Sequence, residues 1–224
     1  MYVMSSAALT SPAAERNKGV IGDILAKYIP KGQEKEVHYN ALEIAAGYGS
    51  HVMYNSERFP TVKWVVTEKD PACIKSIIAH LNSVDNVRKN VVGPFSFDVS
   101  SEIDSWPKEI KELQGRVDLL LSVNLLHITA WENVKCLFAV ASKLLKGNGE
   151  GKLLTYGPFA FQGVLTPESN VEFDKHLKLN NPDWGIRDTA DLEIEASREG
   201  NMALVDVHDM PANNKTLVWS RMPS

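Results

Sequence analysis

The sequence predicts an α/β fold built on a doubly wound, mostly parallel sheet. Strand-like apolar runs and amphipathic helical segments alternate five times between residues 40 and 156, which is the order that a parallel sheet requires. The run VDLLLSV at 117–123 is apolar without alternation, as expected for a central strand with helices on both faces. A glycine turn at 47–49 joins the first strand directly to a helix.

In the first half of the chain, turn residues separate each predicted element from the next. Ser11 with Pro12 opens one helix and Asp70 with Pro71 opens another, because proline is favoured in the first helical turn. We expect helices at 11–29, 49–58 and 70–84, and strands at 40–45, 62–67 and within 90–97.

In the second half, the alternation continues and then breaks. We first expect a short amphipathic segment at 106–113, a strand at 117–123, a helix at 131–145 and a strand at 151–156. After a stretch rich in Pro, Gly and Asn, we expect helices near 169–179 and 189–199 and strands near 202–208 and 215–220. Two terminal strands of this kind differ from the duplicated halves of a dinucleotide-binding domain.

Composition limits the functions that the chain can have. Its 224 residues are 44% hydrophobic and 23% charged, which fits one globular domain. The net charge of −4 argues against broad binding to nucleic-acid backbones. Two cysteines in helical contexts indicate neither a disulfide framework nor a metal site. We therefore expect a cytoplasmic protein, with the nucleus left open, and no membrane partner because no apolar run approaches 18 residues.

The expected organisation is a flexible N-terminal tail at 1–12 and a single domain at 13–224. Residues 157–190 are longer than an ordinary connection, so we expect a substrate-side insertion there. Tyr156, Phe159, Trp184 and Arg187 are our candidates for substrate contact. The alternative is that the prolines and glycines around them only shape the loops.

The segment ALEIAAGYGSH at 41–51 is the first candidate ligand site. A strand that leads through glycines into a helix lets the backbone approach a ligand, and the helix start offers free N–H groups. Glu43 precedes the turn formed by Gly47 and Gly49. A carboxylate there suits a ligand with an amino group or hydroxyls and disfavours a pyrophosphate.

Acidic residues also end the next two strands. Glu68 follows the glycine turn by about twenty residues, a spacing at which a carboxylate can bind both hydroxyls of an adenosine ribose; the alternative is an exposed carboxylate at a strand end. Asp98 is placed to accept from an adenine amino group with Phe97 beside the ring, and the alternative is a helix cap.

Two further positions carry polar candidates. Asn124 and His127 follow the fourth strand, at the edge where open α/β folds bind ligands. His127 is the candidate general base, and the alternative is an ordinary loop histidine. Arg16 lies in the polar cluster ERNK, which either pairs with a ligand carboxylate or is a solvated helix face.

Together, these segments resemble class I S-adenosylmethionine-dependent methyltransferases. ALEIAAGYG, TEKD and FDV are similar to the first three motifs of that family. The segments ERNK, YGPF, ESN, NPDWGIRD and MPANN resemble a poorly characterised branch that includes methyltransferase-like protein 26, over residues 14 to 221.

The resemblance implies a seven-stranded sheet whose last strand is antiparallel. It implies S-adenosylmethionine as cofactor, with Glu43 and the turn facing its methionine part, Glu68 its ribose and Asp98 its adenine. Asn124 joins this cofactor set, and Asn170 of the ESN segment joins the substrate candidates. Ala45 departs from the family pattern, because many members have a glycine there.

The implied activity is in-line methyl transfer to a small molecule or a protein, with no metal required. NLLH at 124–127 lacks the signature of nucleobase amino-methylases, which weakens that interpretation. Two alternatives stay open, a non-catalytic cofactor-binding protein and a nicotinamide-dependent oxidoreductase. The sequence does not indicate the methyl acceptor or the oligomeric state.

Overall fold

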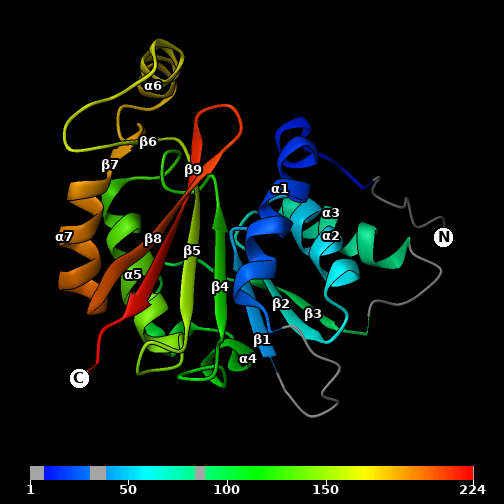
Figure 1. Cartoon of the computed structure of the whole chain (residues 1–224). Coiled ribbons are helices and arrows are strands. Elements are labelled where there is room, and N and C mark those ends of the chain that lie inside the picture. The colour runs from blue at the N-terminus through cyan, green and yellow to red at the C-terminus, as the bar shows by residue number, and fades with distance from the viewer. Residues whose placement is uncertain (1–7, 31–38, 84–88, 224) are drawn as a thin grey trace. The chain divides into compact units, whose positions relative to one another are not determined.

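The computed structural model describes residues 8–30, 39–83 and 89–223. They form an α/β fold whose main sheet has seven strands in the order β3-β2-β1-β4-β5-β9-β8. Residues up to Asp98 form one compact unit, unit 1, and residues from Val99 form another, unit 2. The two units are described separately below (Figure 1).

Unit 1 contains three helices and three strands. They are α1 (Pro12–Tyr28), β1 (Tyr39–Ile44), α2 (Ser50–Arg58), β2 (Val62–Glu68), α3 (Pro71–Asn82) and β3 (Val91–Ser96). Strand β1 pairs with β2, and β2 pairs with β3, both in parallel. The expected elements of the first half are therefore confirmed to within about two residues at their ends, a normal uncertainty for helix and strand boundaries.

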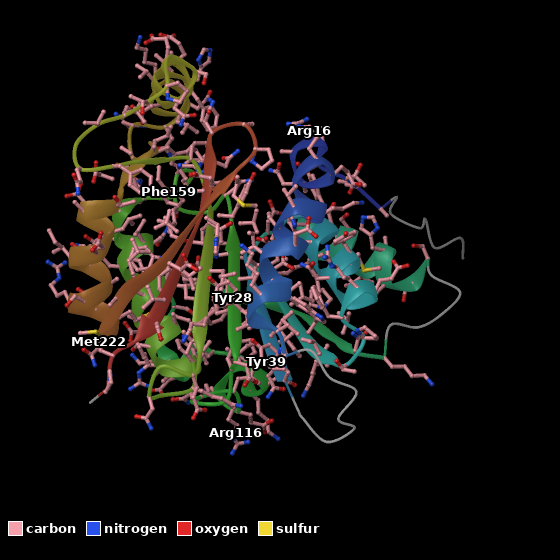
Figure 2. The ribbon with its side chains drawn as sticks, in the orientation of Figure 1. Arg16, Tyr28, Tyr39, Arg116, Phe159 and Met222 are labelled. Atoms are coloured by element: carbon pink, nitrogen blue, oxygen red, sulfur yellow. The ribbon has the colours of Figure 1, made fainter. Side chains whose placement is uncertain are left out.

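The start signals read from the sequence act as expected in unit 1. The side chain of Ser11 caps α1 and that of Asp70 caps α3, each accepting from a backbone N–H in the first turn. At the other end of α1, the Tyr39 hydroxyl donates to the Tyr28 carbonyl at 3.1 Å, which ties the helix end to the start of β1 (Figure 2).

The expected N-terminal tail lies partly outside the described residues, which begin at residue 8. Within its described part, Leu9 is attached to α3. Its N–H donates to Ser76 Oγ at 2.8 Å, and its carbonyl lies 2.8 Å from His80 Nε2. The segment just before α1 is thus anchored to α3 by hydrogen bonds between residues far apart in the sequence.

Unit 2 holds the remaining elements. They are a 3₁₀ turn (Ile103–Ser105), α4 (Lys108–Lys111), β4 (Leu119–Val123), α5 (Trp131–Leu144), β5 (Lys152–Gly157), β6 (Phe159–Ala160), α6 (Glu168–Asn180), β7 (Arg187–Asp188), α7 (Thr189–Gly200), β8 (Met202–Met210) and β9 (Asn214–Arg221). The expected insertion at 157–190 thus includes β6, α6 and β7. Its two-residue strands, which pair in parallel, carried no sequence signal.

The sheet of unit 2 changes direction at its last strands. Strand β4 is parallel to β5, whereas β9 runs antiparallel to both β5 and β8. This confirms the antiparallel last strand that the resemblance implies. Apolar burial explains the arrangement, since Trp219 of β9 packs edge-on against Phe138 of α5 with ring centroids 5.0 Å apart. The Trp219 indole donates to Thr155 Oγ1 of β5 at 3.0 Å.

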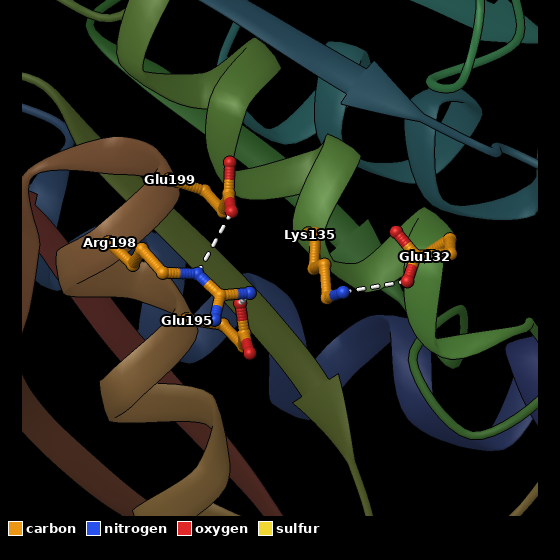
Figure 3. Close-up of polar contacts among 5 residues, drawn as sticks. All are labelled: Glu132, Lys135, Glu195, Arg198 and Glu199. Carbon is orange, nitrogen blue, oxygen red and sulfur yellow. Dashed lines mark hydrogen bonds and ion pairs between the residues drawn. The ribbon is translucent and has the colours of Figure 1, made fainter.

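Helices α5 and α7 carry contrasting ion pairs (Figure 3). On α7, Arg198 bridges Glu195 at 2.5 Å and Glu199 at 3.0 Å, and the Glu195 side chain is only 8% exposed. On α5, Lys135 pairs at 2.6 Å with Glu132, whose side chain is 76% exposed. Because exposed pairs contribute little, the bond of Arg198 to the buried Glu195 is the one expected to stabilise the unit.

Within the described ranges, no helix combines the length and hydrophobicity needed to cross a bilayer.

Candidate functional site

The three strand ends of unit 1 lie side by side at one edge of the sheet. The Ala46 N–H donates to the Thr67 carbonyl, and the Phe97 N–H donates to the Glu68 carbonyl, both at 3.1 Å. The chain segments that leave β1, β2 and β3 are therefore hydrogen-bonded neighbours. This brings together the acidic positions that the sequence analysis singled out from three successive units.

The glycine turn after β1 is made of left-handed residues. Ala45, Gly47 and Gly49 have φ values of +56°, +57° and +89°. A Cβ at Gly49 would lie 2.9 Å from Cγ1 of Ile77 in α3, whereas a Cβ at Gly47 would meet nothing within 4 Å. Gly49 is thus required for packing, and Gly47 leaves open space beside the turn. Ala45 adopts the glycine-like conformation at some strain.

Glu43, on β1 just before this turn, is 1% exposed. Neither of its carboxyl oxygens has a hydrogen-bond partner among the described residues. Burial raises the pKa of Glu43 to about 8, and the nearby carboxylate of Glu68 adds to the rise. A buried carboxyl of this kind is an anomaly for a purely structural residue, because buried polar groups are nearly always hydrogen-bonded.

Glu68, at the end of β2, holds the turn in shape. Its Oε2 accepts from the Gly47 N–H at 2.7 Å, and its Oε1 accepts from the N–H groups of Lys69 at 2.7 Å and Asp70 at 3.0 Å. Glu68 is 6% exposed, so it is not an exposed carboxylate at a strand end. A carboxylate has about four acceptor positions, so three backbone bonds leave about one for a ligand hydroxyl.

Asp98 and Phe97 follow β3. Asp98 pairs with Lys69 Nζ at 3.4 Å, and its side chain is 37% exposed. Phe97 is buried. The next helical turn begins at Ile103 with Glu102 as its cap, so the structure does not support the helix-cap alternative for Asp98. An exposed acceptor beside a buried aromatic ring is consistent with the expected adenine contact.

Arg16 is exposed near the start of α1 (Figure 2). The neighbouring residue Glu15, rather than Arg16, interacts with α2. Lys18, at 2.5 Å, lowers the pKa of Glu15, and Ser50 and His51 lower it further. The polar cluster at 15–18 therefore reaches the start of α2 through Glu15, and the assignment of Arg16 to a ligand carboxylate stays a prediction.

Sequence reasoning missed a group of polar side chains on α2. His51 Nδ1 and both amide atoms of Asn55 are buried and have no hydrogen-bond partner among the described residues. Burial lowers the pKa of His51 to about 4, so the ring is neutral at physiological pH. The sequence signal that could have pointed to this group was His51, which follows the glycine turn almost directly in Gly49-Ser50-His51.

This donor and acceptor set fits an adenosyl ligand that carries an amino group. Glu43 is an acidic group without a partner, Gly47 leaves room for close backbone approach, and Glu68 and Asp98 are acceptors at the ends of successive strands. The carboxylate of Glu68 beside the turn disfavours a pyrophosphate, which argues against the nicotinamide alternative.

In unit 2, the structure brings Asn124 and His127 together at the end of β5. A Cβ at Gly157 would lie 3.1 Å from His127 Nδ1 and 3.7 Å from Asn124 Oδ1. Asn124 has φ of +60°, and its N–H donates to the Tyr156 carbonyl at 2.8 Å. Strained non-glycine residues are frequent at functional sites. Asn124 and His127 are therefore our candidate functional residues in unit 2.

His127 is a weaker base than its sequence position suggested. Burial, followed by the charge of Arg187, lowers the pKa of His127 to about 4. The ring packs edge-on against Phe173 of α6 with centroids 5.6 Å apart. His127 is neutral at physiological pH, so it can accept a hydrogen bond but holds a transferred proton poorly.

Arg187, a substrate candidate, binds three backbone carbonyls in two loops. Its guanidinium donates to the carbonyls of Leu126 at 3.0 Å, Thr129 at 2.6 Å and Asp183 at 2.7 Å. It also lies over the Trp131 ring, 5.4 Å from the centroid. These bonds indicate a role in holding the loop after β4, and substrate contact by Arg187 stays a prediction.

The other substrate candidates occupy different settings. Tyr156 and Phe159 are buried, and Trp184 is half-buried in the loop before β7 (Figure 2 labels Phe159). The buried Asn170 amide donates to the carbonyls of Thr166 at 3.1 Å and Asn213 at 3.4 Å. Asn170 thus links α6 to the turn before β9.

A cavity of about 510 Å³ in unit 2 is lined by parts of α5, β6, α6, β7 and α7. Of the candidate residues, it includes Arg187 but neither Asn124 nor His127. Asp174 on its wall is already paired with Lys178 at 2.6 Å and accepts from the Ile186 N–H at 2.7 Å. Asp174 is thus already bound within the protein.

Residues 8–221 match the model of a family described as "Protein of unknown function (DUF938)". The chain belongs to the DUF938 family. That description assigns no activity to the family, so the solved structures provide the further comparison.

Several solved structures similar to this DUF938 protein are described as methyltransferases. An O-methyltransferase family protein from Burkholderia thailandensis gives a TM-score of 0.70 at 15% identity, over 95% of this chain and 58% of that one. An O-methyltransferase family 2 protein from Planctomyces limnophilus, in complex with apigenin, gives 0.67 at 19% identity, over 97% and 63%.

CalO1, described as a methyltransferase in calicheamicin biosynthesis in its SAH-bound form, gives a TM-score of 0.66 at 14% identity, over 94% of this chain and 54% of CalO1. This chain spans less than two thirds of each of these three proteins. At such low identity, the similarity establishes a shared Rossmann-like fold.

Proposed function

We propose that this DUF938 protein is an S-adenosylmethionine-dependent methyltransferase that acts on a small molecule or a protein side chain. The observation that carries the proposal is the set of acidic groups around the glycine turn of unit 1. Glu43 has no hydrogen-bond partner among the described residues, and Glu68 and Asp98 follow at the ends of the next two strands. The SAH-bound neighbour CalO1 supports the same cofactor.

Each group in unit 1 has a proposed task. Glu43 attracts the amino group of the methionine part, Glu68 accepts from the ribose with its remaining lone pair, and Asp98 accepts from the adenine amino group beside Phe97. The bound cofactor supplies an electrophilic methyl group on sulfur. The Gly47 N–H, fixed by Glu68 at 2.7 Å, keeps the turn in the shape that lets the ligand approach the backbone.

In unit 2, Asn124 and His127 are our candidates for orienting the acceptor. With its pKa lowered to about 4, neutral His127 accepts a hydrogen bond from an acceptor N–H or O–H and aligns its lone pair. Orientation alone is a large part of catalysis in a displacement reaction. Tyr156, Phe159, Trp184, Asn170 and Arg187 remain proposed substrate-side residues.

The low basicity of His127 favours one alternative, a non-catalytic S-adenosylmethionine-binding sensor or partner subunit. We further propose membership of the branch that includes methyltransferase-like protein 26, and a reducing compartment such as the cytoplasm, consistent with two free cysteines.

Turnover separates the enzyme from the sensor. The protein is incubated with S-adenosylmethionine carrying a labelled methyl group and with fractionated cell extract, and methylated products are identified by mass. We expect labelled product with the wild type and at least a tenfold lower rate with Asp98→Asn, which keeps the shape of the side chain. Binding without any labelled product over all fractions would favour the sensor.

A further inference from the structure

The surroundings of Glu43 disfavour its ionised form. Both carboxyl oxygens are buried, and no described residue donates a hydrogen bond to either. A buried carboxylate without donors is strongly disfavoured, whereas the protonated acid carries no net charge. Its pKa is accordingly raised to about 8.

No positive side chain among the described residues compensates Glu43. The charged group that acts on it is Glu68 of β2, which has the same sign and raises the pKa. Of the other titratable groups on nearby elements, Glu15 of α1 pairs with Lys18, Asp98 after β3 pairs with Lys69, and His51 of α2 is neutral. Within the described ranges, a bound ligand is thus the remaining source of a positive charge that would favour ionised Glu43.

We propose that Glu43 is a neutral carboxylic acid in the ligand-free protein and releases its proton to solvent when a ligand with a positively charged amino group binds at the glycine turn. The proposal rests on the proposed function, since S-adenosylmethionine and S-adenosylhomocysteine both carry such a group. It adds that binding is coupled to proton release through one identified side chain.

The size of the effect follows from the charge and the distance. With a pKa of about 8, Glu43 is about nine-tenths protonated at pH 7. A unit positive charge within about 6 Å favours the ionised form by roughly a hundredfold at the effective dielectric of a protein. The protonated fraction then falls to about one-tenth, so we expect about 0.8 proton released per ligand at pH 7. This effect does not require direct contact between the Glu43 carboxyl group and the ligand amino group.

Calorimetry measures this release directly. S-adenosylhomocysteine is titrated into the full chain at pH 7 in phosphate and in Tris, two buffers with very different ionisation enthalpies. The difference between the two heats gives the number of protons released. Because the amino group of the ligand also titrates above neutral pH, the readout is the difference between the wild type and Glu43→Gln, in which residue 43 has no titrating group.

We expect Glu43→Gln to bind the ligand but to release about 0.8 proton fewer than the wild type at pH 7. At pH 9 the wild type should release no more protons than Glu43→Gln, since Glu43 is then already ionised and its remaining effect is to favour proton uptake by the ligand amine. If Glu43→Gln does not fold, the wild type alone provides the test. The Glu43 part of its release must then decline between pH 7 and pH 9 after subtraction of the ligand amine, which is titrated separately.

The outcomes separate two failures. Absence of binding heat with either cofactor form in the wild type would overturn the proposed function. Binding with equal proton release in the wild type and in Glu43→Gln would overturn this inference alone and leave the cofactor assignment standing. An Asp98→Asn control should weaken binding but release the same number of protons, because Asp98 is paired with Lys69 and half-exposed.

Discussion

The two glycines of the turn after β1 should respond differently to the same substitution. Alanine at either position adopts a left-handed conformation, which costs about 1–2 kcal/mol and is partly offset by about 0.4–1 kcal/mol of reduced unfolded-state entropy. For Gly47→Ala, nothing else is within 4 Å of the new Cβ. We therefore expect a net loss of stability of about 0.5–1 kcal/mol.

Gly49→Ala adds a steric conflict to the same backbone strain. The new Cβ would lie 2.9 Å from Cγ1 of Ile77, which is fully buried in α3. Overpacking in a close-packed core costs about 1–3 kcal/mol. The expected total for Gly49→Ala is therefore about 2–4 kcal/mol, clearly larger than for Gly47→Ala.

Urea unfolding followed by tryptophan fluorescence and circular dichroism gives both stability changes. A double-mutant cycle with Ile77→Ala isolates the clash, and Gly49→Ala should then cost at least about 1 kcal/mol less than in the wild-type background. Equal losses for the two glycines, or additivity in the cycle, would refute the packing argument. Gly47→Ala should also weaken S-adenosylmethionine binding at least tenfold while the protein stays folded, because its Cβ occupies the open space beside the turn.

Two further predictions concern ion pairs and pH. Arg198→Met should lower stability by about 1–2 kcal/mol because it leaves the buried carboxylate of Glu195 unpaired. Lys135→Met should cost less than about 0.5 kcal/mol because its partner is exposed. Equal shifts of the two urea midpoints would contradict this. Stability should peak near pH 6.5. Below it, His51 and His127, with pKa values of about 4, bind protons more readily when unfolded, and together they outweigh Glu43. Above it, Glu43 stays protonated up to about pH 8 only when folded, so unfolding is favoured as pH rises. The expected slope is about 1 kcal/mol per pH unit on each side, and a stability that rises steadily from pH 5 to pH 8 would contradict it.

The fold was largely predictable because its signals are local. Proline after an oxygen-bearing cap fixed the starts of α1 and α3, and the apolar run at 117–123 contains β4. The short pair β6 and β7 was not predictable, because two residues carry no periodicity and their pairing depends on tertiary contacts. The bonds of Leu9 to α3 were equally invisible, since they join positions 67 and 71 residues apart.

The candidate site also has some features that the sequence could predict and others that it could not. Spacing along the chain placed Glu43, Glu68 and Asp98 at adjoining strand ends, because parallel strands share one carboxyl edge. Protonation depends on burial, so the neutral state of His127 was beyond the sequence. The three carbonyl bonds of Arg187 were also unpredictable, since they come from two separate loops.

The most direct test of the account is calorimetric titration of the wild type with S-adenosylmethionine and S-adenosylhomocysteine, alongside Glu68→Ala. We predict one ligand per chain for both compounds and affinity at least tenfold weaker in the variant, with circular dichroism confirming that it is folded. Absence of heat in the wild type, or equal affinity in folded Glu68→Ala, would contradict the account of an adenosyl site at the glycine turn.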